Sequence, residues 1–294
     1  LMRYSDALLL LLLSAIWGAS FLFMRVASPE FGPVALVLVR MGGAALVVLP
    51  FLLSAKFRRA LIENFWPLAF LGFINQAVPF VLLSFSTLRL EAGFTSLLNA
   101  TTPMFTAIVG VLWFTTPINR TQVLGLLIAF AGVAILSLDK LDFKSEGPGW
   151  AILAGLVATF CYGIAVNFSK KRLAHLSADQ ITTGSMLAST AMLLIPGIYF
   201  WPETNPSTVA WGSAIGLAVV CTAIAFLLFF RVLSRAGAMA SATVTFLVPV
   251  FAIAWGVSLL GETLNARLIL GMVVTLFGTA ITLQMIRLPK LSRA

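Results

Sequence analysis

The sequence predicts an all-α integral membrane protein, with ten transmembrane helices arranged as two inverted five-helix repeats around a central cavity. Three observations lead to this prediction: the composition, a long internal repeat and the distribution of basic residues. Of the 294 residues, 60% are hydrophobic and 10% are charged, and the mean hydropathy is +1.04. A soluble domain of this length could not bury so much apolar surface, so we expect a membrane protein.

Ten apolar segments are long enough to cross a hydrocarbon core of about 30 Å, which takes about 20 helical residues. We predict spans at residues 6–26, 32–54, 66–87, 91–115, 120–138, 148–169, 177–200, 208–230, 237–260 and 265–286. Most loops are short, but residues 139–149 form a charged linker that ends in Gly-Pro-Gly. The linker divides the chain into a first repeat, residues 1–140, and a second repeat, residues 141–294.

The second repeat follows the first at an offset of 146 residues, and residues 92–138 align with residues 238–284 without a gap. Proline, glycine and asparagine positions coincide in this alignment: Pro103 with Pro249, Gly110 with Gly256, Asn119 with Asn265, Gly125 with Gly271, and Gly132 with Gly278. These matches carry more weight than leucine on leucine in so apolar a chain. A repeat of five spans is inverted in its second copy, as in many transporters with alternating access.

The net charge of +9 indicates topology rather than nucleic-acid binding. With the N-terminus in the cytoplasm, 13 of the 19 Lys and Arg residues fall on the inner side, five on the outer side and Arg40 within a span. By the positive-inside rule, both termini are cytoplasmic, and we expect the chain in the cell inner (plasma) membrane. The expected partners are a small-molecule substrate and membrane lipid, and a monomer is plausible.

No catalytic motif, metal site or cofactor site is predicted. The single histidine, His175, lies in a basic loop, and the two cysteines, Cys161 and Cys221, lie within predicted spans. Neither pattern indicates a metal site or a disulfide framework. All ten acidic residues fall at span ends or in loops. Proton coupling usually requires an ionisable group at depth, so facilitative transport is favoured over proton coupling.

Polar residues at membrane depth are candidate substrate ligands. Arg40 lies about 12 Å into its span, at a rise of 1.5 Å per residue. It either binds an anionic substrate group in a wet cavity or holds helices together by capping carbonyls or pairing with a loop acid. Asn75, Gln76 and Asn99 lie near the midplane. We expect them to line a solute path, although such amides also join helices, a bond worth about 1 kcal/mol.

Two aromatic positions are related by the repeat, because an offset of 145 places Trp17-Gly18 on Tyr162-Gly163. Trp17 lies roughly 16 Å deep by helical rise. Each ring either offers a flat face to a planar solute or marks tight helix packing at the neighbouring glycine. Phe80 is a further candidate, although most of the 24 phenylalanines are expected to pack or to face lipid.

The coinciding prolines Pro103 and Pro249 are candidate hinges. A proline removes a backbone hydrogen bond and kinks its helix. Symmetric kinks in the fourth and ninth spans suit gates that open alternately to each side. The alternative is a static bend that neighbouring helices stabilise.

Three segments resemble a known family: Trp17-Gly18-Ala19-Ser20-Phe21, Leu36-Val37-Leu38-Val39-Arg40, and Leu260-Gly261-Glu262-Thr263-Leu264 before Gly271. Together with the repeat, they resemble the EamA-type members of the drug/metabolite transporter superfamily. The resemblance implies two inverted five-helix bundles around a central cavity and export of small metabolites. Bacterial aromatic amino-acid exporters are the most similar members. The copies differ at Thr115-Thr116, opposite Gly261-Glu262, and at Tyr162, so a fully symmetric site is not expected.

The predicted function is therefore that of a secondary transporter that exports amino acids, aromatic ones preferred, or related small metabolites. Trp17 and Tyr162 would stack on a ring, while Arg40, Asn75, Gln76 or Asn99 would hold the amino and carboxyl groups. The alternative within this fold is an exporter of drugs, lipophilic cations or other metabolites, with or without proton coupling. A channel or scaffold would give non-saturable flux or none. A membrane enzyme is the least expected class, since no acid, base and metal groups are placed together.

Overall fold

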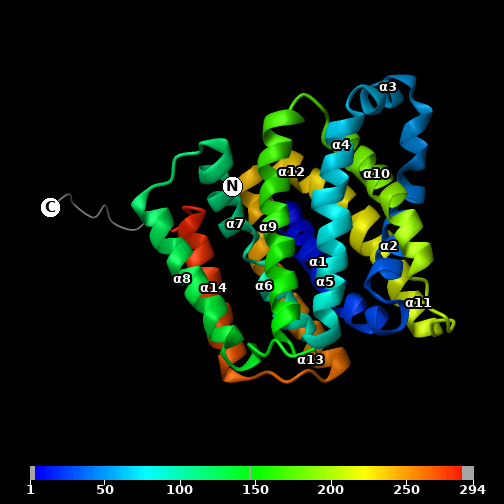
Figure 1. The fold of residues 1–294 in the computed structure, drawn as a ribbon. Coiled ribbons are helices and arrows are strands. Elements are labelled where there is room, and N and C mark those ends of the chain that lie inside the picture. The colour runs from blue at the N-terminus through cyan, green and yellow to red at the C-terminus, as the bar shows by residue number, and fades with distance from the viewer. Residues whose placement is uncertain (1–3, 146, 287–294) are drawn as a thin grey trace.

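The computed structural model describes residues 4–145 and 147–286, and every regular element within these ranges is a helix (Figure 1). The first half holds α1 (Tyr4–Phe31), α2 (Pro33–Val48), η1 (Leu49–Leu53), α3 (Ala55–Glu63), α4 (Phe65–Gly72), η2 (Phe73–Ala77), α5 (Val78–Arg89), α6 (Ala92–Asn99), α7 (Thr102–Phe114), α8 (Arg120–Ser137) and η3 (Leu138–Lys140). The second half holds α9 (Gly149–Arg172), α10 (Ala178–Tyr199), α11 (Thr208–Ile215), η4 (Gly216–Ile224), α12 (Ala225–Ala242), α13 (Val244–Leu260) and α14 (Ala266–Thr282). The predicted all-helical class is confirmed.

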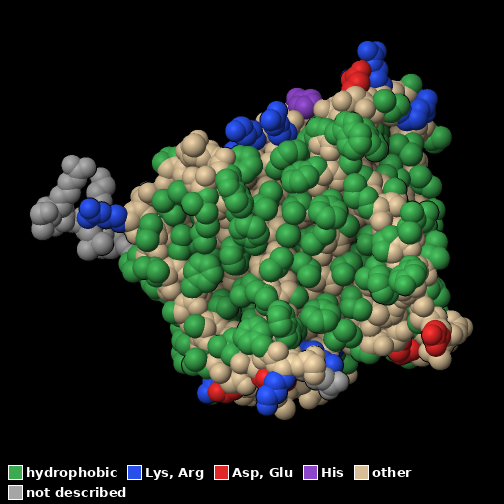
Figure 2. Space-filling view, viewed as in Figure 1, with side chains coloured by type: hydrophobic (Ala, Val, Ile, Leu, Met, Phe, Trp, Pro, Cys, Tyr) green, Lys and Arg blue, Asp and Glu red, His purple; other side chains and the backbone are tan. Residues whose placement is uncertain are grey.

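Helical segments of suitable length and apolarity cover the predicted spans. In the described chain, eight such segments could cross a membrane: Asp6–Phe31, Pro33–Leu53, Phe65–Arg89, Ala92–Phe114, Arg120–Lys140, Gly149–Arg172, Ala178–Tyr199 and Thr208–Leu233. The last two predicted spans correspond to shorter apolar helices, α13 and α14, of 17 residues each. Figure 2 shows hydrophobic side chains over the middle of one face and charged side chains at its two ends. This distribution is expected of a helix bundle in a bilayer.

Several of these segments are not regular α-helices. The turn η2 and the longer stretch η4 are π-helical, and such insertions often mark functional sites. The fourth segment breaks at Ala100 and Thr101, between α6 and α7. The predicted ninth span is interrupted near its start: Gly237 takes a positive φ of 81° within α12, and a turn at Thr243 then separates α12 from α13. Glycine reaches this backbone region without steric cost.

Two glycines bring helices into close contact at corresponding places in the two halves. A Cβ atom on Gly18 of α1 would lie 2.7 Å from the Cβ atom of Phe251 in α13. A Cβ atom on Gly163 of α9 would lie 2.8 Å from the carbonyl carbon of Phe105 in α7. Gly18 aligns with Gly163, and Phe105 with Phe251. Both halves therefore use a glycine to let one helix approach the backbone of another.

The ends of α7 and α13 also correspond. Each helix ends in a left-handed residue, Thr115 with φ of 53° and Gly261 with φ of 66°. The N–H groups of these residues donate to the carbonyl oxygens of Gly110 and Gly256, respectively. Glycine takes this conformation freely, whereas threonine is strained in it. The two helix ends therefore share the same backbone geometry, although one has threonine and the other has glycine.

The helices α8 and α14 lie side by side at one edge of the bundle (Figure 1). Gly132 of α8 contacts Thr275, and Gly278 of α14 contacts the backbone of Ala129. These small residues allow the two helices to pack closely. At the opposite side of the bundle, α2 packs against α10.

Candidate functional site

Arg40 lies in the middle of α2 and is buried, with 5% of its surface exposed. Its Nε atom donates a hydrogen bond to Thr222 Oγ1 at 2.9 Å, and Nη1 lies 3.8 Å from Met24 Sδ. The guanidinium carbon lies 3.7 Å from the ring centre of Phe80. The cation is therefore held by an aromatic face and a hydroxyl group. Within the described residues, it forms no ion pair with a carboxylate.

The contacts of Arg40 leave part of its guanidinium unused. Arginine carries five N–H groups, and the contacts to Thr222 and Met24 engage Nε and Nη1. Among the residues that the structure describes, Arg40 caps no carbonyl and pairs with no loop acid, the two structural roles considered for it. Its bond to Thr222 does connect α2 to η4. A guanidinium with free donors in apolar surroundings is well suited to a carboxylate, which it can bind through two parallel hydrogen bonds.

Aromatic side chains surround the region of Arg40. Trp17 of α1 packs on Phe226 at 6.1 Å between ring centres and on Phe229 at 5.4 Å. Tyr162 of α9 packs against two buried clusters, one that includes the neighbours of Trp17 and one that contains Phe80. Four helices, α1, α2, α5 and α9, thus bring Trp17, Arg40, Phe80 and Tyr162 into one central region, and α12 adds the two phenylalanines that contact Trp17. Each of these rings is already in contact with other side chains.

The predicted amides differ in their surroundings. Gln76, in the π-helical turn η2, is buried and donates from Nε2 to Ser185 Oγ at 3.1 Å, while its Oε1 atom has no partner. Asn75 is half-buried, and its side chain makes no hydrogen bond within the described chain. The buried Oδ1 atom of Asn99, at the end of α6, is also without a partner. Two unpartnered amide oxygens are therefore available to a donor such as an ammonium group.

Among the described residues, packing contacts connect Gln76 to the region of Arg40 and do not connect Asn99 to it. Its partner Ser185 directly precedes Met186, which belongs to the same buried cluster as Phe80. Asn99 belongs to the junction of α6 and α7, where α6 packs against α9 and α13. No contact given by the described residues joins Asn99 to Arg40.

The two predicted hinges occupy different positions in their helices. Pro103 lies in the first turn of α7, directly after the break at Ala100 and Thr101. Pro249 lies inside α13 and is buried. The two prolines therefore do not produce identical breaks, because the second half interrupts its helix earlier in the chain. Each proline lies two residues before the phenylalanine that contacts a glycine of the neighbouring helix.

Sequence reasoning did not single out several residues of this region. Thr222, Met24 and Phe229 all contact Arg40 or Trp17. For Phe226 a signal existed, since the offset of 146 pairs it with Phe80. No comparable signal marks Thr222, which is one hydroxyl among many in the predicted spans.

A separate cavity of about 330 Å³ lies at one end of the bundle, between α6, α8 and α14. It is lined by Glu91, Phe94, Leu136, Asp139, Lys140, Asn265, Arg267 and Leu268. None of the predicted site residues belongs to this lining. Arg267 and Asp139, two of its four charged residues, form an ion pair.

Comparison with known proteins gives a consistent result over both halves. Residues 5–138 and 149–284 each match the EamA-like transporter family. Over 276 residues, the chain is 26% identical to "Uncharacterized transporter YdfC" of Bacillus subtilis. The match covers 92% of this chain and 88% of that protein. Over 264 residues, it is 25% identical to "Probable terminal-alkyne amino-acid exporter" of Streptantibioticus cattleyicolor, covering 89% of this chain and 88% of that protein.

A solved structure described only as "Crystal structure of protein" has a similar fold. It superposes with a TM-score of 0.65 and 16% sequence identity, and the match covers 97% of this chain and 98% of that chain. At this identity the likeness concerns the fold alone. The fold similarity extends over nearly the whole of both chains.

Proposed function

Because the chain belongs to the EamA-like transporter family, within the drug/metabolite transporter superfamily, we propose that it exports amino acids from the cytoplasm, with aromatic ones preferred, or related small metabolites. The observation that carries the proposal is the buried Arg40, which has unused donors and lies among Trp17, Phe80 and Tyr162. A buried cation with no ion-pair partner among the described residues suits an anionic ligand. Aromatic neighbours suit a ring. One relative with this fold is named as an amino-acid exporter.

In this proposal, Arg40 binds the substrate carboxylate through its free N–H groups. The unpartnered Oε1 atom of Gln76 accepts a hydrogen bond from the substrate ammonium group, and Asn75 and Asn99 line the path. The substrate ring displaces part of the contact between Trp17 and the phenylalanines of α12. Aromatic pairs are worth about 0.5–1.5 kcal/mol beyond their buried area, so a substrate ring can replace one at little net cost.

We propose that the chain forms two inverted five-helix halves, residues 1–140 and 141–294, with α13 and α14 completing ten spans. The family match supports this division, since it falls separately on residues 5–138 and 149–284. The packing also supports it: α1 crosses α13 as α9 crosses α7, and α8 pairs with α14. A helix of 17 residues is about 25 Å long, which approaches the thickness of the hydrocarbon core.

Alternating access is the proposed mechanism, with Pro103 and Pro249 as hinges. Polar contacts join the two proposed halves at the end that we assign to the outside: Ala92 N to Glu262 Oε1 (2.8 Å), Ser207 N to Glu30 Oε2 (2.6 Å), Thr263 Oγ1 to Glu91 Oε1 (3.4 Å), and Arg267 to Asp139. These contacts support an outward-closed state. Their exchange for an outward-open arrangement would release the substrate. The positive-inside distribution supports cytoplasmic termini in the inner membrane.

Transport by purified protein in liposomes tests the proposal. Labelled phenylalanine should enter in a saturable manner, and excess tryptophan should compete with it, whereas glycine should compete poorly. Saturable flux of a lipophilic cation, with no flux of any amino acid, would instead support the drug-exporter alternative. The unpaired positive charge of Arg40 argues against that alternative, because a cation in the same site would be repelled.

A further inference from the structure

The helix α3 crosses one end of the bundle between α2 and α4 and is anchored at its start (Figure 1). The Oγ atom of Ser54 accepts a hydrogen bond from the N–H of Phe57 at 3.4 Å and so caps the helix. Arg58 donates from Nη1 to the carbonyl oxygens of Leu52 at 2.7 Å and Leu53 at 3.2 Å. These are carbonyls at the end of η1, which would otherwise lack a partner. Arg58 therefore stabilises the local fold and is not proposed as a ligand.

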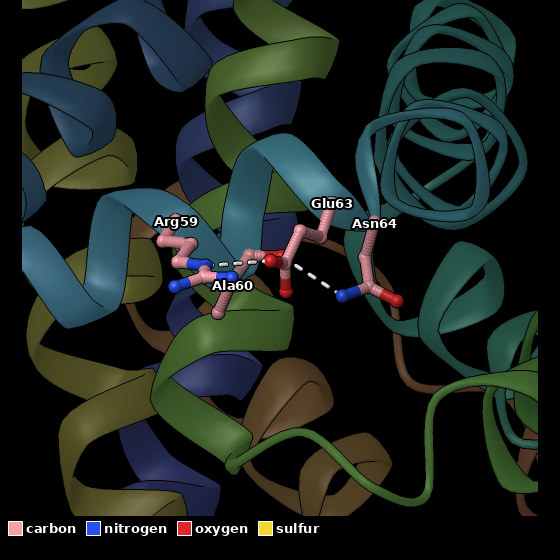
Figure 3. Close-up of polar contacts among 4 residues, drawn as sticks. All are labelled: Arg59, Ala60, Glu63 and Asn64. Carbon is pink, nitrogen blue, oxygen red and sulfur yellow. Dashed lines mark hydrogen bonds and ion pairs between the residues drawn. The ribbon is translucent and has the colours of Figure 1, made fainter.

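The end of α3 is anchored as well. Figure 3 shows Asn64 donating from Nδ2 to the carbonyl oxygen of Ala60, at 2.9 Å. The Oδ1 atom of Asn64 lies 3.0 Å from Nε2 of His175, in the loop between α9 and α10. The single histidine of the sequence thus bonds to the junction of α3 and α4. A helix of nine residues that is fixed at both ends keeps a defined orientation.

That orientation gives α3 one side toward the protein and one away from it. Phe57 stacks on Phe51 with 5.7 Å between ring centres and 17° between planes, and Leu61 packs against a buried cluster of α4 and α9. Large apolar side chains on and beside the outer side are strongly exposed: Leu53 (84%), Ile62 (75%) and Trp66 (79%). Leu53 belongs to η1, Ile62 to α3 and Trp66 to α4, so exposed apolar side chains lie on α3 and directly before and after it.

The outer side of α3 also carries charged side chains. Lys56 and Arg59 are exposed, and at 3.6 residues per turn Arg59 lies about 60° and Lys56 about 120° around the helix from Ile62. Figure 3 shows Arg59 donating from Nε to Oε1 of Glu63, at 2.7 Å. This bond raises the pKa of the Arg59 guanidinium. Further basic residues, Lys170, Lys171 and Arg172, lie at the end of α9 on the same side of the bundle.

We propose that α3 is an interfacial helix that binds the headgroup of an anionic phospholipid through Lys56 and Arg59, with Ile62 and Trp66 among the acyl chains. The proposal rests on the membrane placement described above but not on the substrate. A short helix that exposes both basic and apolar side chains lies in the plane of the interface, where the basic groups meet headgroups and the apolar groups meet acyl chains. The cytoplasmic leaflet is the one that carries anionic lipid.

Lipid rather than a protein partner is the occupant that these features favour. Ile62 of α3 and Trp66 of α4 are exposed on the same segment as Lys56 and Arg59, so this segment offers cationic groups for a phosphate and apolar side chains for acyl chains. The exposed basic groups and the exposed apolar side chains therefore both favour an anionic phospholipid.

Retention of lipid measures the binding directly. Nanodiscs of equal phosphatidylglycerol and phosphatidylcholine would be prepared, and the lipids retained by the protein would be counted by native mass spectrometry. Lys56→Gln should weaken phosphatidylglycerol retention about fivefold, the change expected for one cation near an anionic surface. Glu63→Gln should strengthen it about 1.5- to 5-fold, because it releases Arg59 from an exposed ion pair.

The double variant Lys170→Gln/Lys171→Gln is the matched control, since it removes basic charge on the same side but outside α3. A loss equal to or larger than that of Lys56→Gln would overturn the proposal in favour of diffuse attraction. Unchanged or weaker retention by Glu63→Gln would also overturn it. In a chain with Cys161 and Cys221 replaced by alanine, a spin label at Ile62→Cys should be more accessible to oxygen than to a water-soluble nickel chelate. A label that meets mainly the chelate would contradict the interfacial placement.

Discussion

Replacing Arg40 by glutamine separates a role in substrate binding from a role in helix packing. The substitution removes the charge and the carboxylate-binding fork, while a shorter polar side chain remains near Thr222 and Phe80. Hydrogen bonds to charged groups are worth about 1.5–3 kcal/mol. Since about 1.4 kcal/mol corresponds to a tenfold change, the KM for phenylalanine should rise about 10- to 150-fold.

The same substitution should have little effect on stability. It removes a cation–π contact worth about 2 kcal/mol when desolvated and the bond to Thr222. It also removes a buried charge whose desolvation costs several kcal/mol. These changes oppose each other, so the thermal midpoint of Arg40→Gln should stay within a few degrees of the wild-type value. Arg40→Lys keeps the charge but loses the two-point geometry and should give an intermediate KM.

The assay is inhibition of labelled phenylalanine uptake into proteoliposomes by two competitors, phenylalanine and phenethylamine. Phenethylamine keeps the ring and the ammonium group but lacks the carboxylate. If Arg40 binds the carboxylate, Arg40→Gln weakens inhibition by phenylalanine and leaves inhibition by phenethylamine unchanged or improved. Equal weakening of both competitors, together with a lower thermal midpoint, would refute the reasoning and assign Arg40 to packing.

Three further predictions concern the helices around the proposed site. Glu262→Gln removes the negative charge at the start of α6, worth about 0.3–1 kcal/mol at a helix N-terminus, and should speed hydrogen exchange in the first turn of α6; unchanged exchange would exclude a role in outward closure. Gly18→Ala and Gly163→Ala place a Cβ atom under 3.0 Å from the facing helix and should each cost about 1–3 kcal/mol, seen as a lower thermal midpoint. A Cβ atom on Gly212 would have no neighbour within 4 Å, so Gly212→Ala is the control. An equal loss of stability in that variant would contradict the packing argument. Thr115→Gly should raise the midpoint, because the left-handed conformation costs threonine about 1–2 kcal/mol and glycine little; a lower midpoint would count against this.

Much of the arrangement of helices was predictable from the sequence, because the features that produce it are local. Gly18 and Gly163 were aligned from the sequence, and each allows a close helix approach that needs only a missing side chain. The Asn119 and Asn265 positions coincide in the repeat, and both asparagines cap the helix that follows. Length and apolarity were sufficient to locate the helical segments, since a bilayer fixes the length of helix that crosses it.

The site was harder to predict, because its contacts join distant parts of the chain. Arg40 could be recognised from its charge at depth, but its partner Thr222 is 182 residues away and differs in no visible way from other hydroxyl residues. Pro103 and Pro249 occupy different positions in their helices because the chain breaks at Ala100 and Thr101 before α7 and at Thr243 before α13, a difference that the aligned sequences do not mark. The helix α3 was treated as a loop, because its nine residues are too few for a span.

Uptake of labelled phenylalanine and tryptophan into proteoliposomes of the purified protein tests the central claim most directly. Glycine and a lipophilic dye serve as control solutes, and each is measured with and without a pH gradient. The account predicts saturable uptake of both aromatic amino acids that does not depend on the gradient, since no described carboxylate pairs with Arg40 in the site. Saturable transport of the dye, with no uptake of either amino acid, would contradict it.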